Sequence, residues 1–201
     1  ITIFDRTYQS PMIFGPTGLA GIVWPDGDLE LARACKAMDV AFCQSTSSNA
    51  GVEQVAKANQ GFWFQLYIQR DRAYSRALLQ RAWDSGARVL ILTVDLPIAG
   101  ARERDVRNGF TMPPRIGLDN IFDYMTKLGW LWRFATGPRF TMGNLALGAN
   151  GSESLTTLTK YIASQFDASV TWKDLDWIRS EWKGHLAVKG ILRPDDAVRA
   201  Q

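Results

Sequence analysis

The sequence predicts an α/β protein with a parallel β-sheet. Short apolar segments alternate, through short links, with segments whose apolar residues recur at helical spacing. The strand candidates are continuously apolar, which is typical of strands buried on both faces. Polar or conformationally special residues follow them, where parallel α/β folds bind ligands. No G-x-G-x-x-G motif follows the first strand, so we predict a TIM (β/α)8 barrel, with about the first five strands present, rather than a dinucleotide-binding Rossmann fold.

The first half of the chain supplies four strands and the helices between them. Asp28 is the N-cap candidate for the first helix and Asp71 opens the third, because short polar side chains accept backbone N–H bonds there. Gly86 ends the third helix. The predicted elements are, in order, strand Pro11–Gly15, helix Leu29–Met38, strand Val40–Cys43, helix Val52–Ala58, strand Phe62–Tyr67, helix Asp71–Trp83 and strand Val89–Val94.

Residues 117–160 interrupt this alternation and form a long insert after the fourth strand. The part at 121–134 is rich in aromatic side chains, with Lys127 and Arg133 among them. This composition fits a segment that lies on a membrane surface. A lid or a subunit contact fits it equally well. Regular structure resumes with a helix near 155–162, a helix at 171–179 with Thr171 as N-cap, strand His185–Ile191 and a helix that begins at 193–197 with Pro194 in its first turn.

Composition narrows the functional classes. The chain has 46% hydrophobic and 21% charged residues, and its net charge of +3 is too small to predict nucleic-acid binding. Cys35 and Cys43 predict neither a disulfide framework nor a metal site, and they suit a reducing cytosol. We find no secretory signal and no apolar run near the roughly 20 residues of a spanning helix. The start at Ile1 and the end within a predicted helix suggest an incomplete chain.

The end of the fourth strand gives the first indication of a site. Thr93 is a polar residue at the end of an otherwise apolar strand, and Arg102 lies in the loop that follows. A capped strand with a solvated loop would explain this segment alone. Similar endings follow the earlier strands, at Pro16, Thr17, Gly18, Ser45, Gln65 and Tyr67. Four successive endings of this kind favour a ligand site over coincidental capping.

These motifs resemble the FMN-dependent α-hydroxy acid dehydrogenase and oxidase family, which includes mandelate dehydrogenase, lactate dehydrogenase and glycolate oxidase. The matching pieces occur in family order and at family spacing across nearly the whole chain. They are Gly15–Gly18, Ser45–Asn49, Trp63–Tyr67, Leu92–Asp95, Gly100–Asp105, Asp167–Trp172 and Val188–Ile191. With the aromatic insert, Thr17–Leu19 and Ser45–Thr46 look most like the membrane-associated mandelate dehydrogenase branch.

The resemblance implies an FMN that lies across the C-terminal mouth of the barrel. The positions that match those lining the flavin ring or bonding its polar edge are Pro16, Thr17, Gly18, Ser45, Gln65 and Thr93. Lys189 matches the lysine near the flavin N1 and C2 carbonyl edge, where a fixed positive charge stabilises the reduced ring. A surface lysine is the alternative, although a lysine that ends an apolar strand seldom reaches solvent freely.

The resemblance also implies two substrate contacts. Tyr67 would hydrogen-bond the hydroxyl or carboxylate of the substrate. Arg102 would hold the carboxylate, because a planar guanidinium donates two parallel bonds. Arg104 competes for this role, and the motif alignment favours Arg102. The predicted catalytic residues are therefore Tyr67, Arg102 and Lys189.

One family element is missing from these residues. The histidine that takes the proton and its partner arginine belong to an S-x-H-G-G-R motif, which would follow the strand after Lys189, beyond Gln201. His185 is the only histidine, and it begins a strand, so we expect it at the wrong face of the barrel. The phosphate-binding loops and a second substrate tyrosine are also absent. We therefore expect an FMN-dependent dehydrogenase, an oxidase being less favoured, whose active site is incomplete in this chain and inactive on its own.

The implied partners are a small 2-hydroxy acid, mandelate-like or lactate-like, and an electron acceptor, quinone or oxygen. The resemblance further implies a homo-tetramer when the protein is intact, with peripheral membrane contact and a cytoplasmic location at the inner face of the cell membrane. Two alternatives remain open. One is a non-catalytic module that binds a membrane or a partner, and the other is a TIM-barrel enzyme that uses a phosphorylated ligand without flavin.

Overall fold

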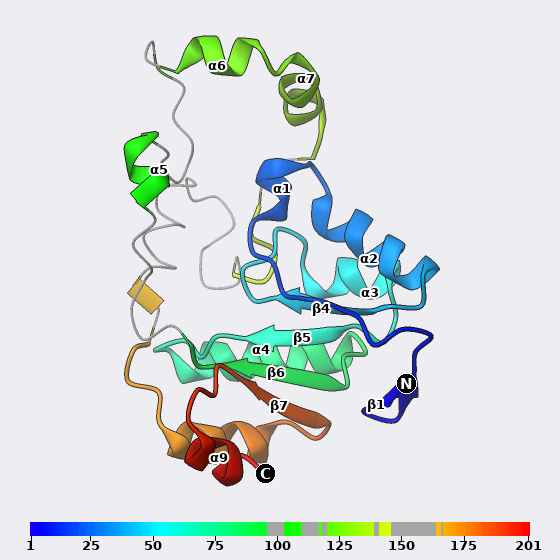
Figure 1. The fold of residues 1–201 in the computed structure, drawn as a ribbon, viewed down its shortest axis with the longest axis vertical. Coiled ribbons are helices and arrows are strands. Elements are labelled where there is room, and N and C mark those ends of the chain that lie inside the picture. The colour runs from blue at the N-terminus through cyan, green and yellow to red at the C-terminus, as the bar shows by residue number, and fades with distance from the viewer. Residues whose placement is uncertain (96–102, 110–116, 118–119, 139–140, 146–163, 166) are drawn as a thin grey trace.

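A computed structural model shows a five-stranded parallel sheet at the centre of the molecule (Figure 1). It describes residues 1–95, 103–109, 117, 120–138, 141–145, 164–165 and 167–201. The strand order equals the sequence order, as in a barrel wound in one direction, whereas a doubly wound sheet reverses its order. The strands are β3 (Ile13–Phe14), β4 (Ala41–Ser45), β5 (Trp63–Leu66), β6 (Val89–Thr93) and β7 (His185–Lys189).

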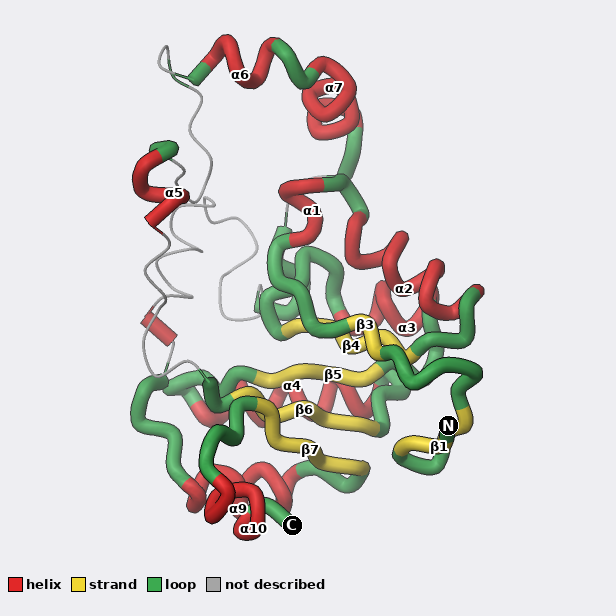
Figure 2. Tube along the Cα trace, in the orientation of Figure 1, coloured by secondary structure: helices red, strands yellow, loops and turns green. Residues whose placement is uncertain are grey.

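The predicted α/β class and the five barrel strands are confirmed. Figure 2 shows the strands side by side, with helices along them. The helices are α1 (Ala20–Val23), α2 (Gly27–Ala37), α3 (Val52–Ala58), α4 (Arg72–Asp84), α5 (Glu103–Arg107), α6 (Ile121–Met125), α7 (Leu128–Thr136), α9 (Trp172–Glu181) and α10 (Pro194–Arg199). The expected helix near 155–162 lies outside the described residues.

Two helix starts agree with their sequence signals. The side chain of Asp71 caps α4 by accepting hydrogen bonds from Ala73 N (2.9 Å) and Tyr74 N (3.2 Å). Thr171 precedes α9, and its backbone N–H donates to the carboxylate of Asp174 at 2.8 Å. The capping chemistry that the sequence predicts therefore sets these two boundaries.

The predicted N-cap role of Asp28 is wrong. Helix α2 begins at Gly27, after Asp26 adopts a left-handed backbone with φ 59°. Asp28 is buried, and its carboxylate accepts hydrogen bonds from Asn49 N (2.7 Å) and Ala50 N (3.1 Å). Burial raises the pKa of Asp28, and these backbone donors oppose that shift. The carboxylate thus anchors the loop after β4 instead of the helix.

The sheet separates two apolar layers. On one face, Phe64, Leu90 and Leu92 pack with the helix residues Val55 and Leu78 in the main core. On the other face, smaller and aromatic residues form a second cluster, made of Tyr8, Ala41, Cys43, Trp63 and Val89. Alternate residues of one strand supply both layers, as the two-residue repeat of a strand requires. The second layer is the interior of the partial barrel.

An N-terminal hairpin, which the sequence did not predict, covers one end of this interior. Strands β1 (Thr2–Ile3) and β2 (Arg6–Thr7) pair antiparallel around Phe4 and Asp5, both with positive φ. The Phe4 ring lies edge-on to Trp63, with 5.2 Å between ring centroids. Trp63 Nε1 donates to the hydroxyl of Tyr8 at 3.2 Å. The hairpin therefore covers the N-terminal ends of the strands and leaves the opposite ends for a site.

Candidate functional site

The register of the sheet brings the predicted cofactor residues onto one face. Ser45 pairs with Gln65, and Gln65 with Ile91. Thr93, two residues beyond Ile91, pairs with Lys189. Because neighbours in register point to the same face and residues two apart repeat that face, these side chains line the barrel interior at the C-terminal strand ends.

Ser45 and Gln65 are joined by hydrogen bonds. Ser45 Oγ donates to Gln65 Oε1 at 3.2 Å, and Thr46 N donates to the same oxygen at 3.3 Å. Thr46 Oγ1 also donates to the Gln65 carbonyl at 2.7 Å and accepts from Tyr67 N at 3.1 Å. The side-chain oxygen of Gln65 is thereby satisfied, and its amide nitrogen is left to serve another acceptor.

Two polar atoms at this place have no partner among the described residues. They are Gln65 Nε2 and Thr93 Oγ1, and both residues are at least 94% buried, with relative exposures of 1% and 6%. A buried polar atom without a hydrogen bond costs roughly 1–3 kcal/mol, so such atoms mark a missing ligand or water. A planar ring that carries carbonyl and ring-nitrogen acceptors along one edge fits this pair.

The segment that contains Pro16, Thr17 and Gly18 borders the same site. Leu19 N donates to the Ser47 carbonyl at 3.1 Å, which holds the segment against the loop after β4. A Cβ atom at Gly18 would lie 3.1 Å from Ser47 Cβ, so a side chain there would crowd the loop. Thr17 and Gly18 are exposed and are therefore accessible to a bound molecule.

Lys189 forms an ion pair with Asp95 at the mouth of the partial barrel. Val94 N donates to the Lys189 carbonyl at 2.9 Å, which extends the pairing of β6 with β7 past Thr93. Burial raises the pKa of Tyr67; the negative charge of Asp95 raises it further, and Lys189 opposes the shift. The three side chains thus share one electrostatic environment, in which Tyr67 stays a neutral hydrogen-bond donor.

Asp95 is a site residue to which the sequence analysis gave no role, although it lies within the matched motif Leu92–Asp95. Its signal was its position two residues after Thr93, on the same side of the extended chain. Arg102, the predicted carboxylate ligand, lies outside the described residues. Arg104 lies in α5 and is exposed.

His185 lies far from this mouth, as predicted. It begins β7, whereas Lys189 ends the strand, and four residues of a strand span roughly 13 Å. His185 Nε2 lies 2.8 Å from the carboxylate of Asp5 in the N-terminal hairpin, and its ring stands 5.2 Å from the ring of Phe4. The only histidine in the sequence therefore contacts the N-terminal hairpin, at the opposite end of the strands from the site.

The described part of the insert lies beside the segment that follows β3 (Figure 1). Trp130 Nε1 in α7 donates to the Ile22 carbonyl at 2.9 Å, and the guanidinium of Arg133 stacks 4.3 Å from the centroid of the Trp24 ring. Helices α6 and α7 expose large apolar residues, namely Ile121, Phe122, Met125, Leu128, Trp132 and Phe134. In the described ranges, no helix is long and apolar enough to cross a membrane.

Comparison with known proteins identifies the family to which the sequence is similar. A family model described as FMN-dependent dehydrogenase matches residues 1–201. An L-lactate dehydrogenase of Caulobacter sp. (strain K31) is 40% identical over 201 residues, which cover 99% of this chain and 53% of the relative. An L-lactate dehydrogenase of Bartonella quintana (strain Toulouse) is 37% identical over 202 residues, covering 100% and 52%. The chain spans about half the length of the curated relatives it matches.

Solved structures give the same assignment. The monotopic membrane protein (S)-mandelate dehydrogenase superposes with a TM-score of 0.92 at 32% identity, over 100% of this chain and 53% of that one. A mandelate oxidase with (S)-4-hydroxymandelic acid superposes with a TM-score of 0.77 at 30% identity, over 100% and 50%. A mandelate oxidase variant that carries a C4a-OH-FMN adduct reaches a TM-score of 0.73 at 29% identity, over 100% and 47%.

Proposed function

Because the chain belongs to the FMN-dependent dehydrogenase family, we propose that the intact protein oxidises a 2-hydroxy acid to the 2-oxo acid with FMN at the mouth of the barrel. The observation that carries the proposal is the pair of buried, unpartnered atoms Gln65 Nε2 and Thr93 Oγ1 among the described residues. They lie on adjacent strands and on the face where the family places its cofactor. The alternative of a TIM-barrel enzyme that uses a phosphorylated ligand without flavin does not explain why the chain belongs to this family.

The geometry of the strand ends supports the proposed cofactor contacts. Gln65 Nε2 donates to the polar edge of the ring, Thr93 Oγ1 shares that edge, and Ser45 orients Gln65. The backbone at Pro16, Thr17 and Gly18 lies against the ring. FMN, when bound, supplies the two-electron acceptor. Lys189 supplies positive charge beside it, and its ion pair with Asp95 fixes the direction of the ammonium group.

The proposed substrate contacts are Tyr67 and Arg102. Since burial raises the pKa of Tyr67, its phenol remains protonated at neutral pH and donates a hydrogen bond to the hydroxyl or carboxylate of the acid. Arg102 pairs with the carboxylate. We propose that the proton acceptor comes from residues that these 201 do not include, because His185 is held by Asp5 at the other end of β7. On this proposal the 201 residues alone do not turn over substrate.

A second proposed function is contact of the insert with the membrane surface at the inner face of the cell membrane. Its support is the exposed apolar surface of α6 and α7, which carries the aromatic residues Phe122, Trp132 and Phe134 beside Lys127 and Arg133. The structurally similar (S)-mandelate dehydrogenase is described as a monotopic membrane protein. An acceptor dissolved in the membrane, such as a quinone, would suit this location, and we therefore favour a dehydrogenase over an oxidase.

The test is anaerobic mixing of the intact, FMN-loaded protein with L-lactate or (S)-mandelate while the visible flavin absorbance is followed. Loss of absorbance with either acid, together with slow peroxide formation when air is admitted, is the expected result. A colourless protein that takes up no FMN would contradict the flavin assignment. Rapid peroxide formation under air would contradict the preference for a dehydrogenase.

A further inference from the structure

One side chain of the insert closes the loop that carries the polar residues after β4. Asn144 is fully buried, with 0% exposure. Its Nδ2 donates to the carbonyl of Ser45, the last residue of β4, at 3.1 Å. Its Oδ1 accepts from the backbone N–H of Val52, the first residue of α3, at 2.9 Å. A single amide thus bridges both ends of the loop at residues 46–51, more than ninety positions away in the sequence.

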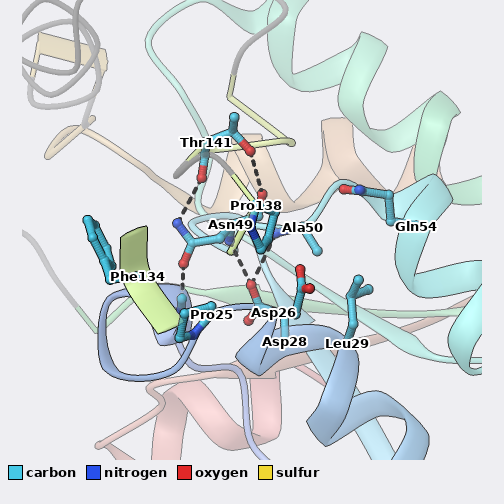
Figure 3. A pocket seen from close by; sticks show the side chains of 11 residues that line it. Pro25, Asp26, Asp28, Leu29, Asn49, Ala50, Gln54, Phe134, Pro138 and Thr141 are labelled. Carbon is cyan, nitrogen blue, oxygen red and sulfur yellow. Dashed lines mark hydrogen bonds between the residues drawn. The ribbon is translucent and has the colours of Figure 1, made fainter. Parts of the chain in front are cut away.

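The neighbours of Asn144 pack onto the same loop. Gly143 N donates to the Asn49 carbonyl at 2.9 Å. Asn49 Nδ2 donates to the Thr141 carbonyl at 2.8 Å (Figure 3). A side chain at position 143 would collide with the backbone of Gly51. Residues 141–145 therefore pack directly against the loop, which holds Asn144 in place.

The loop is held from its other side by the segment that follows β3. Asn49 Oδ1 accepts from Gly21 N at 2.8 Å. The carboxylate of Asp28 accepts from Asn49 N and Ala50 N, and these bonds are visible at the centre of Figure 3. Residues 141–145 and the segment after β3 thus enclose the loop that links Ser45 to Val52.

We propose that Asn144 is a positioning residue of the cofactor site, and this inference rests on the proposed FMN function. Its bond to the Ser45 carbonyl fixes the end of β4. Ser45 Oγ then donates to Gln65 Oε1, and this bond turns Gln65 Nε2 toward the cofactor. A residue of the insert thereby sets the orientation of a cofactor donor that it does not touch. The part of the insert around Asn144 therefore belongs to the proposed flavin site.

The two hydrogen bonds of the Asn144 amide allow a separation of roles. Asn144→Asp keeps an oxygen for Val52 N–H but replaces the donor that faces the Ser45 carbonyl with a second acceptor. Asn144→Ala removes both bonds. Asn59→Asp is the matched control, since Asn59 is also a buried asparagine, with 4% exposure, but lies at the C-terminal end of α3.

The intact protein is used for three measurements on each variant: the FMN dissociation constant from fluorescence quenching, the visible circular dichroism of the bound flavin, and hydrogen exchange at the Val52 amide. We expect Asn144→Asp to weaken FMN binding about tenfold, as for loss of one well-placed bond to a buried acceptor. The dichroism changes, and exchange at Val52 stays slow. Asn144→Ala weakens FMN binding similarly and also speeds exchange at Val52. Asn59→Asp leaves FMN affinity and dichroism unchanged.

Unchanged FMN affinity and dichroism in folded Asn144→Asp would overturn the inference. So would an equal loss in Asn59→Asp, because it would show a general effect of a buried charge. Failure of both Asn144 variants to fold, with Asn59→Asp folded, would assign Asn144 to stability alone and would likewise overturn it. Wild-type protein that binds no FMN would refute the proposed function itself, a result distinct from wild-type binding that the variants leave intact.

Discussion

Lys189 and Asp95 form an ion pair across the C-terminal ends of β7 and β6, and the backbone of Val94 bonds to the Lys189 carbonyl beside it. The ammonium group is thus directed by an acid from the neighbouring strand, at the edge of the proposed flavin site. The pair also changes the electrostatic environment of Tyr67, so that the lysine proposed to supply charge lies in one cluster with the tyrosine proposed to bind substrate.

Replacement of Lys189 by methionine is expected to slow flavin reduction about 100-fold, which is the size of effect seen when one charge-stabilising donor is removed from an active site. The substrate concentration for half-maximal rate should change far less. Stopped-flow reduction under anaerobic conditions measures both quantities. Lys183→Met, at an exposed position before β7, is the control. Equal reduction rates in wild type and Lys189→Met would refute the proposed role.

Thr93→Val should have opposite effects on the empty and the loaded protein. The Thr93 hydroxyl has no partner among the described residues, so replacing it by a methyl group should stabilise the FMN-free protein by about 1 kcal/mol and weaken FMN binding several-fold. Thr46→Val is the contrast, because Thr46 Oγ1 is bonded to Gln65 O and Tyr67 N, and its loss should destabilise the protein. Thermal unfolding with and without FMN measures this, and a destabilised FMN-free Thr93→Val would contradict it.

Gly190→Ala should destabilise the protein more than Gly86→Ala does. Both glycines have positive φ, 110° and 97°, so both substitutions strain the backbone by roughly 1–2 kcal/mol. Only at Gly190 would the added Cβ also lie 2.8 Å from Asp95, while nothing lies within 4 Å at Gly86. The free energy of unfolding in urea measures the difference. An equal decrease in the free energy of unfolding for both variants would contradict this prediction, because it would show that Asp95 moves away from the added Cβ without destabilising the protein.

The pH dependence of stability should carry a contribution from Tyr67. Because burial raises the pKa of Tyr67 in the folded protein, its stabilising contribution is present below the ordinary tyrosine value of about 10 and is lost as pH rises through the higher folded value. Tyr67→Phe should therefore reduce the loss of stability at alkaline pH. Urea unfolding between about pH 8 and about pH 11 tests this, with Tyr124→Phe as the control. Identical pH profiles for wild type and Tyr67→Phe would contradict it.

Trp132→Glu should reduce sedimentation of the intact protein with anionic vesicles by about tenfold or more, because a charge replaces an anchoring aromatic side chain at the interface. Trp132 in α7 is 71% exposed. Leu192→Glu is the control, since Leu192 is 92% exposed but lies next to α10. Equal loss in both variants would indicate non-specific apolar adsorption. No loss in Trp132→Glu would count against membrane contact by the insert.

Much of the fold was predictable because local signals agreed with tertiary packing. The helix Val52–Ala58 matches its predicted bounds, and Asp71 caps α4 as expected. Asp28 was misassigned because its residue type suits an N-cap equally well. Its actual role depends on a loop more than twenty positions away, which a local pattern does not encode. The N-terminal hairpin was missed because its turn needs two successive left-handed residues, and Phe4 is a residue type that seldom adopts that backbone.

The candidate site was predictable to the extent that it lies at strand ends. The places of Ser45, Gln65 and Thr93 follow from strand register, which the polar endings indicate. Asp95 carried the same kind of signal, two residues beyond Thr93, but its pairing with Lys189 joins positions 94 residues apart. Asn144 carried no such signal, because it follows no predicted strand and its contact with Ser45 spans 99 positions.

The position of the insert, between the end of β6 at Thr93 and the start of β7 at His185, also affects how the chain folds. The earlier barrel strands pair with partners close by in sequence, whereas β6 and β7 meet only after residues 94–184 have been made. Loop-closure entropy grows with the logarithm of length, and each doubling costs only about 0.6 kcal/mol. The long connection therefore lowers the free energy of unfolding only slightly, but it slows the pairing of β7 with β6. We expect β3 to β6 to come together first and β7 to join them in a separate, slower kinetic phase.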